Sequence, residues 1–235
     1  MRFRKSLLRS ITAAVIFLKT NEYYNEFLKT IEQIKVSGKK PRLLLHACCA
    51  PCSSAVLEKI YQVFSVTLFF YNPNITQKSE YDFRLSELER LTKEMPNLRN
   101  INILNGNYEP QRFFEISKGL EMLPEGGERC FKCYRLRLEE TAKTAKSGGY
   151  DYFCTTLSIS PHKNAAVLNE IGKEIAETYG VDYLFSDFKK QNGYLRSIEL
   201  SKQHNLYRQS YCGCLFSKNQ REHEEAIKKE FKNTK

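Results

Sequence analysis

The sequence has no long hydrophobic run, no internal repeat and no low-complexity linker. Its apolar stretches stay well short of the ~20 residues that a membrane-spanning helix needs, and its mean hydropathy is -0.52. A chain of 235 residues is long enough to bury one ordinary hydrophobic core. We therefore expect a soluble protein with one compact domain and no membrane partner.

A complete export signal is also missing. "MRFRKSLLRS" followed by "ITAAVIFL" imitates the basic and apolar parts of a secretory signal, but the apolar part is short and has no small-residue cleavage site. It continues into apolar residues at helical spacing between positions 24 and 34. We expect a helical lead-in over residues 1–38 and a single α/β domain over residues 39–235.

The chain is basic and rich in aromatic residues. Lysine and arginine number 37 against 27 acidic residues, a net charge of +10, with 14 tyrosines and 15 phenylalanines. This combination suits a polyanion with stackable bases. Much of the charge lies in the two terminal segments, however, where solvated chain ends explain it equally well.

Apolar strand patterns alternate with amphipathic helix patterns. Strands are expected within "PRLLLHACC", "SVTLFFYNPNI", "NLRNINILNG" and "YDYFCTTLSI", with helices between them and one helix ending at Gly148 and Gly149. Strands that bracket a helix pair in parallel through a right-handed crossover. The pattern predicts a doubly wound, mostly parallel α/β sheet with cysteine-rich loops at the carboxyl ends of its strands, where ligands bind in such folds.

Cysteines carry the strongest signal in the sequence. Seven of the eight fall into three groups: Cys48, Cys49 and Cys52; Cys130 and Cys133; Cys212 and Cys214. Thiolate ligands are usually gathered from several loops around one metal centre, so we expect the groups to converge. The eighth, Cys154, lies in a strand pattern and is expected to be a packed core thiol. Because export would oxidise such clustered thiols, we expect a cytoplasmic protein.

Spacing alone leaves the kind of site open. A closed zinc site needs four ligands and would leave three cysteines idle, which favours a redox-active group. "CAPC" at Cys49 to Cys52 also suits thioredoxin-like exchange, but that explains only two cysteines. In "YCGC", the two sulfurs either reach a single metal or form a strained, labile disulfide. A zinc-stabilised RNA-binding module without catalysis is a further alternative.

Polar residues near the predicted strand ends are candidates for contacts with a substrate or a nucleic acid. His46 either supplies a proton or is merely hydrogen-bonded at the end of a strand. His162 and Lys163, after the fourth strand, are expected to touch a phosphate or the substrate. The second strand ends with residues suited to base stacking or hydrogen bonding, although a turn also explains them: Tyr71, Asn72 and Asn74.

Each of the charged residues named next has two possible roles. Asp187 is a candidate general acid or metal ligand, and Lys189 and Lys190 are candidates for RNA backbone contact or for a solvated loop. Arg135 and Arg137 contact nucleic acid or make surface ion pairs with nearby glutamates.

Long blocks of the sequence resemble the epoxyqueuosine reductase family of the QueH type. These blocks run from about residue 40 to 218: "LLLHACCAPCS", "FYNPNI", "EYDFRLSELERL", "PEGGERCFKCYRLRLEETA", "TTLSISPHKNA" and "SDFKKQNGYLRSIELSKQHNLYRQSYCGCLFS". The resemblance implies an iron-sulfur oxidoreductase that reduces the epoxide of epoxyqueuosine to queuosine at the tRNA wobble position, the last step of queuosine-tRNA biosynthesis. Its partners would be tRNAs with GUN anticodons, for aspartate, asparagine, histidine and tyrosine, and a low-potential electron donor.

The resemblance also implies roles for the cysteines and a fold like that of the adenine nucleotide alpha hydrolase group. The ligands of a 4Fe-4S cluster would be Cys48, Cys49, Cys130 and Cys133. Cys212 and Cys214 would form a redox-active disulfide. Our own hypothesis is a second, mononuclear metal with an open position, bound by Cys52, Cys212 and Cys214.

ATP use is not expected. "HACCAPCSS" stands where related folds carry a glycine-rich phosphate loop. "SGGYD" at 147–151 follows a helix and precedes a strand, which is the reverse of the context that a pyrophosphatase loop requires. A tRNA-thiolating or adenylating activity of the same fold group is therefore disfavoured.

Overall fold

The computed structural model describes residues 21–233, and the side chains of residues 21–230. A five-stranded sheet forms its centre, in the order β3-β2-β1-β4-β5. The strands are β1 (Arg42–His46), β2 (Ser65–Phe70), β3 (Asn102–Asn105), β4 (Tyr152–Thr155) and β5 (Asp182–Tyr183). Every pair is parallel. The order runs outward from β1 in both directions, which confirms the predicted doubly wound α/β sheet and puts its switch point between β1 and β4.

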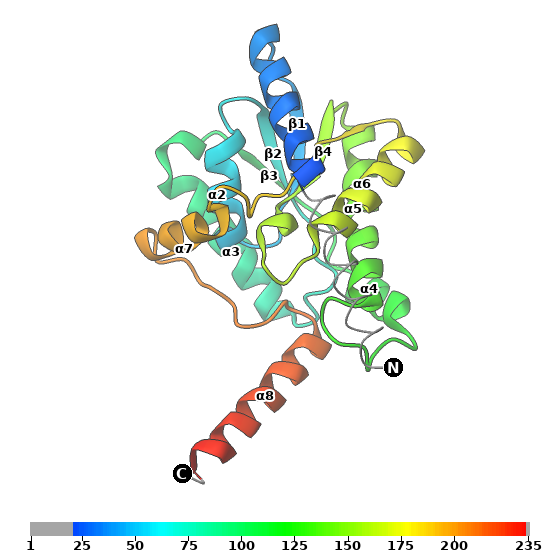
Figure 1. Ribbon diagram of the computed structural model, residues 1–235, viewed down its shortest axis with the longest axis vertical. Helices are drawn as coiled ribbons and strands as arrows, with labels where there is room; N and C mark the ends of the chain where they lie inside the picture. The colour runs from blue at the N-terminus through cyan, green and yellow to red at the C-terminus, as the bar shows by residue number, and fades with distance from the viewer. Residues whose placement is uncertain (1–20, 234–235) are drawn as a thin grey trace, which may run out of the picture.

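Helices cover both faces of the sheet (Figure 1). One layer holds α2 and α3, with α7 packed against α2, and the other holds α5 and α6, with α4 against α5. Their bounds are α2 (Ala50–Ile60), α3 (Lys78–Glu94), α4 (Pro110–Ser117), α5 (Glu128–Ser147), α6 (Ala165–Tyr179) and α7 (Gly193–Gln203). Two short 3-10 helices, η1 (Pro96–Leu98) and η2 (Thr156–Ile159), follow α3 and β4.

The leucine run of β1 explains the two-layer core. Successive side chains of a strand point to opposite faces of the sheet. Leu43 and Leu45 pack into the core on the α2 side, Leu44 packs into the core on the α5 side, and all three are fully buried. Because both faces of a central parallel strand are covered, its sequence is continuously apolar rather than alternating.

The ends of the chain differ in how they join this body. Residues 21–37 are helical, and Phe27 and Ile34 are buried in the core on the α2 side. Residues 1–20 of the predicted lead-in lie outside the described residues. At the other end, α8 (Leu215–Asn233) extends away from the sheet (Figure 1). None of the described helices is long and apolar enough to cross a membrane.

All four predicted strands are confirmed, and the helix expected to end at Gly148 does so, as α5. The elements that were not predicted include β5, which has only two residues, and α4. Helix α2 begins at Ala50, so Cys49 is its N-cap residue and Cys52 lies in its first turn. The division at residue 39 and the likeness to the alpha hydrolase group stay predictions.

Candidate functional site

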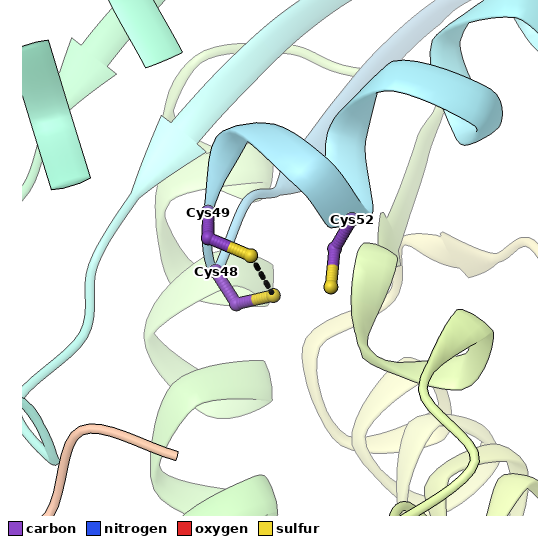
Figure 2. A group of neighbouring side chains, drawn as sticks. All are labelled: Cys48, Cys49 and Cys52. Carbon is purple, nitrogen blue, oxygen red and sulfur yellow. Dashed lines mark hydrogen bonds between the residues drawn. The ribbon is translucent and has the colours of Figure 1, made fainter. Parts of the chain in front are cut away.

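Three cysteines lie together where β1 turns into α2. The sulfurs of Cys48, Cys49 and Cys52 all lie within 4.8 Å of one another, and those of Cys48 and Cys49 are 3.7 Å apart. Figure 2 shows Cys48 and Cys49 on the turn and Cys52 on the first turn of the helix, with their sulfurs turned toward the same space. A strand end followed directly by a helix start thus gathers three soft ligands at one point, which can hold a metal ion.

His46 fixes the position of this turn. The ring lies 3.1 Å from the carbonyl oxygen of Tyr71 through Nε2 and 2.9 Å from Oγ1 of Thr155 through Nδ1. A carbonyl only accepts, so Nε2 donates and Nδ1 accepts from the threonine. Burial lowers the pKa of His46 to about 3. The ring is neutral, fully buried and joins the ends of three neighbouring strands. These features fit a hydrogen-bonded structural role for His46 better than the role of a proton donor.

Thr156 supports Cys48 from the neighbouring strand end. Its Oγ1 accepts from the backbone N–H of Cys48 at 3.3 Å and donates to the Cys48 sulfur at 3.4 Å. Within the group, hydrogen bonds from the thiols of Cys48 and Cys52 lower the pKa of Cys49 well below its usual range. The same contact with Cys49 raises the pKa of Cys48. Hydrogen bonds among the three sulfurs therefore favour the thiolate form at Cys49 over that at Cys48.

The other four clustered cysteines line a small adjacent cavity. Cys130 and Cys133 lie one turn apart at the start of α5, and Cys212 and Cys214 belong to the turn before α8. Cys133 and Cys214 are buried together. All the clustered cysteines are free thiols, as is Cys154, which is fully buried and confirmed as a core thiol.

The Cys212–Cys214 turn is held by a distant arginine. Arg84 of α3 is buried; its Nη1 donates to the carbonyl of Cys212 at 3.1 Å, and its Nε donates to Glu80 at 2.7 Å. Gly213 has a φ of +113°, and a Cβ there would lie 2.9 Å from the side chain of Ile75. Glycine is therefore required between the two cysteines by both backbone conformation and space.

A buried polar chain supports the same turn from the opposite direction. The Nζ of Lys163 donates to Glu125 at 2.7 Å, and Oγ of Ser217 donates to the other carboxylate oxygen at 2.9 Å. Ser217 Oγ in turn accepts from the backbone N–H of Cys212 at 3.1 Å. These hydrogen bonds connect Cys212 to the loop before α5, the loop after β4 and the start of α8.

A larger cavity of about 160 Å³ lies between the cysteines of the turn after β1 and the Cys212–Cys214 turn. It is lined by members of the first group and of the Cys212–Cys214 turn, and by several predicted contact residues: Cys48, Cys52, Cys212, Asn72, Asn74, His162 and Lys163. The residues that line both cavities are Asn74, Glu125, Arg137, Lys163 and Cys212. Each of the three cysteine groups therefore contributes to the lining of two adjoining cavities that share these five residues.

Other predicted residues point elsewhere. The hydroxyl of Tyr71 contacts Glu109 and Arg112, at 3.1 and 2.7 Å. Asp187 pairs with Lys189 at 3.1 Å, and Lys190 donates to the side chain of Asn21. In the described part of the chain, the predicted residues that line neither of these two cavities are His46, Cys49, Tyr71, Arg135, Asp187, Lys189 and Lys190. Their catalytic and substrate roles stay predictions.

Arg135 and Arg137, two arginines of α5, have different environments. Arg135 forms a surface ion pair, but its partner is Glu174 of α6 rather than a nearby glutamate of its own helix. Arg137 is only 1% exposed and lines both cavities, so a surface role for it is wrong. Its position relative to the CxxC pair carried the missed signal: Cys130, Cys133 and Arg137 follow the i, i+3, i+7 spacing of one helix face.

The remaining missed residues had no readable local signal. Arg84 and Glu80 look like an ordinary i, i+4 surface pair in the sequence. Thr156, Glu125 and Ser217 acquire their roles only through contacts between segments that are far apart in the chain.

Comparison with known proteins agrees with this architecture. The family model "Epoxyqueuosine reductase QueH" matches residues 43–220, which include all seven clustered cysteines. A curated protein of that name from Staphylococcus epidermidis is 44% identical over 193 residues, covering 80% of this chain and 81% of the relative. One from Thermotoga maritima is 39% identical over 178 residues, covering 74% and 89%. The chain belongs to the epoxyqueuosine reductase QueH family.

Proposed function

We propose that this protein is an epoxyqueuosine reductase that performs the last step of queuosine biosynthesis. The epoxide of the substrate loses its oxygen: two C–O bonds break, two electrons and two protons are taken up, an alkene forms and water leaves. The observation that carries the proposal is the family match over residues 43–220. Six of the seven clustered cysteines in that range line two adjoining cavities, and the seventh, Cys49, lies beside Cys48 and Cys52.

The proposed substrate is the wobble nucleotide of tRNAs with GUN anticodons. Chemistry on a base in structured RNA usually requires that base to leave its stack and enter a pocket. The charge of the larger cavity supports an anionic nucleotide: among the described residues that line it, five are lysine or arginine and one is a carboxylate. These cations are Arg84, Arg137, Lys163, Arg208 and Arg221. A tRNA substrate and clustered free thiols also support a cytoplasmic location.

We further propose a 4Fe-4S cluster with Cys48, Cys49, Cys130 and Cys133 as its ligands. The donor set fits, because soft thiolates favour iron-sulfur clusters. The electrostatics also fit, since Arg137 has a buried nitrogen without a hydrogen-bond partner and would be balanced by an anionic thiolate group. When bound, such a cluster supplies single electrons at low potential. These would come from a low-potential donor.

The turn with Cys212 and Cys214 has two proposed states. One is a redox-active disulfide, and the other is ligation of a mononuclear metal together with Cys52. Cys52 and Cys212 line the same cavity, which supports the second state. A metal count of the anaerobically purified protein separates them. Loss of one metal atom per chain in a C212S/C214S variant favours the metal site, and an unchanged count excludes it.

The chain's own residues have orienting and proton-holding roles in this proposal. Arg84 and Asn74 fix the carbonyl of Cys212, which orients its sulfur toward the shared wall of the cavities. Lys163 carries protons on Nζ at that wall and is held there by Glu125. It is therefore placed to deliver a proton to an oxygen that leaves the substrate.

The test is anaerobic purification, an absorbance spectrum, iron and sulfide assays, and reaction with dithionite and epoxyqueuosine-containing tRNA. Nucleoside mass analysis should reveal a product lighter by one oxygen, from a brown protein with about four irons and sulfides per chain. Colourless, zinc-loaded protein that leaves the epoxide intact would instead support the RNA-binding alternative.

A further inference from the structure

Arg137 is a buried cation on the inner face of α5. Its side chain is 1% exposed. Nε donates to the backbone carbonyl of Cys133 at 3.1 Å, whereas Nη2 is buried and has no hydrogen-bond partner. Within residues 21–230, no ion pair joins Arg137 to a carboxylate. A guanidinium group keeps its proton in proteins, so this positive charge is permanent.

The other buried cations near the cysteines have more hydrogen-bond or ion-pair partners, although Nε of Arg129 is also buried without one. Arg129 donates to three backbone carbonyls through Nη1, and Arg84 pairs with Glu80 and donates to the carbonyls of the Cys212–Cys214 turn. Lys163 pairs with Glu125. Arg137 differs from Arg84 and Lys163 because it pairs with no carboxylate, and from Arg129 because it donates to a single carbonyl rather than to three.

Cysteines from three separate segments act electrostatically on the guanidinium: Cys133 of α5, Cys212 of the turn before α8 and Cys48 of the turn after β1. The guanidinium carbon also lies 5.8 Å from the centroid of the Tyr134 ring. Arg137 also lines both the larger and the smaller cavity. An unpaired charge in a protein interior is costly, so thiolates, or the anionic group that they hold, must balance it.

We propose that Arg137 is the fixed counter-charge of the cysteine site, a positioning residue that draws the three thiolate groups together and raises the reduction potential of the group they bind. Reduction adds one electron to a buried, already anionic site. A permanent positive charge beside that site stabilises the reduced form more than the oxidised form. This inference rests on the proposed iron-sulfur function.

The first test is a redox titration of the loaded protein, monitored by absorbance and electron paramagnetic resonance. In Arg137→Met, the ratio of reduced to oxidised protein at the wild-type midpoint should fall about tenfold, a shift of about 59 mV for one electron. Arg137→Lys, which keeps the charge, should recover most of that loss. Arg135→Met is the matched control: it removes an exposed arginine two residues away on the same helix and should leave the midpoint unchanged.

The second test measures whether the charge and the thiolates stabilise each other. Iron release to a chelator should be about tenfold faster from Arg137→Met than from wild type. In metal-free protein, Arg137→Met should be the more stable of the two: it should need more urea to unfold than wild type, because it no longer buries an uncompensated charge. A merely structural arginine would destabilise both forms when removed.

Wild-type midpoint and wild-type iron release in Arg137→Met would overturn the proposal. If that variant does not fold or load iron, Arg137→Lys decides: normal loading supports a charge requirement, and failed loading together with lower urea resistance of its metal-free form contradicts it. Failure of the proposed function is separate, because it would appear as wild-type protein that binds no iron or leaves the epoxide intact.

Discussion

The turn after β1 and the Cys212–Cys214 turn bring cysteines to one cavity by different kinds of contact. In the first, a buried strand ends and a helix begins within four residues, so covalent neighbours hold Cys48, Cys49 and Cys52 together. In the second, the chain has no regular structure between α7 and α8, and its shape depends on Arg84 and Ser217. The first turn is therefore expected to tolerate changes elsewhere in the molecule, whereas the second is expected to fail when a remote side chain is lost.

The largest effect should come from removing a cysteine from any of the three groups. Cys48→Ala and Cys130→Ala should each lower the rate of epoxide reduction more than about 100-fold, because each removes a proposed ligand of one shared centre. Cys154→Ala is the control, since that thiol is buried but lines neither cavity. It should cost about 1 kcal/mol of stability and little activity. A Cys48→Ala protein with more than a tenth of wild-type activity would contradict a shared centre.

Arg84→Met tests the dependence of the second turn on remote contacts. The variant leaves Glu80 without its buried partner and frees the carbonyl of Cys212. Stability to urea should fall by about 3 kcal/mol, and activity should fall more than stability alone explains. Lys78→Met on the same helix removes an exposed pair with Asp82 and should change stability by less than about 1 kcal/mol. Equal effects of both substitutions would contradict the role of Arg84 in holding the Cys212–Cys214 turn.

Gly213→Ala tests the shape of the same turn with a smaller change. Its positive φ and the 2.9 Å approach of a Cβ to Ile75 should together cost about 2 to 3 kcal/mol and reduce activity. Gly119 has a φ of +77° with no atom near a Cβ, so Gly119→Ala should cost only about 1 kcal/mol of backbone strain. Similar denaturation midpoints for the two variants would argue that crowding at Gly213 is unimportant.

The first turn should show its own signature, a pH dependence that comes from His46. Its folded pKa of about 3 lies below the unfolded value of 6.5, so the unfolded state binds more protons between these values. The contribution of His46 to the free energy of unfolding is therefore complete above pH 6.5 and is lost as pH falls toward 3. Between pH 7.5 and pH 5.5 the loss amounts to about 1.4 kcal/mol.

Urea unfolding of metal-free protein at the two pH values measures this loss. His46→Gln should remove most of the difference, while His162→Gln, at an exposed position, should leave it unchanged. An undiminished pH dependence in His46→Gln would assign the effect to other groups.

The contrast between the turns also explains how much the sequence could predict. The strand, turn and helix at residues 42–60 follow from a leucine run, a proline and helical spacing, all of which are local. The convergence of the cysteine groups was predicted from the way thiolate ligands are gathered from several loops around one metal centre. The contacts of Arg84 and Thr156, by contrast, join segments more than 100 residues apart, and no local pattern encodes them. Arg137 was misread because its charge suggested the surface, although its spacing from the CxxC pair indicated the inner face of α5.

A single-turnover reaction tests the central claim most directly. Protein reduced with dithionite, freed of excess reductant and mixed with epoxyqueuosine-containing tRNA under anaerobic conditions should lose its stored electrons as queuosine forms. The account predicts one queuosine for every two electrons lost from the protein. Oxidation of the protein without queuosine, or no oxidation while the epoxide remains intact, would contradict the claim that these cysteines form the reducing centre.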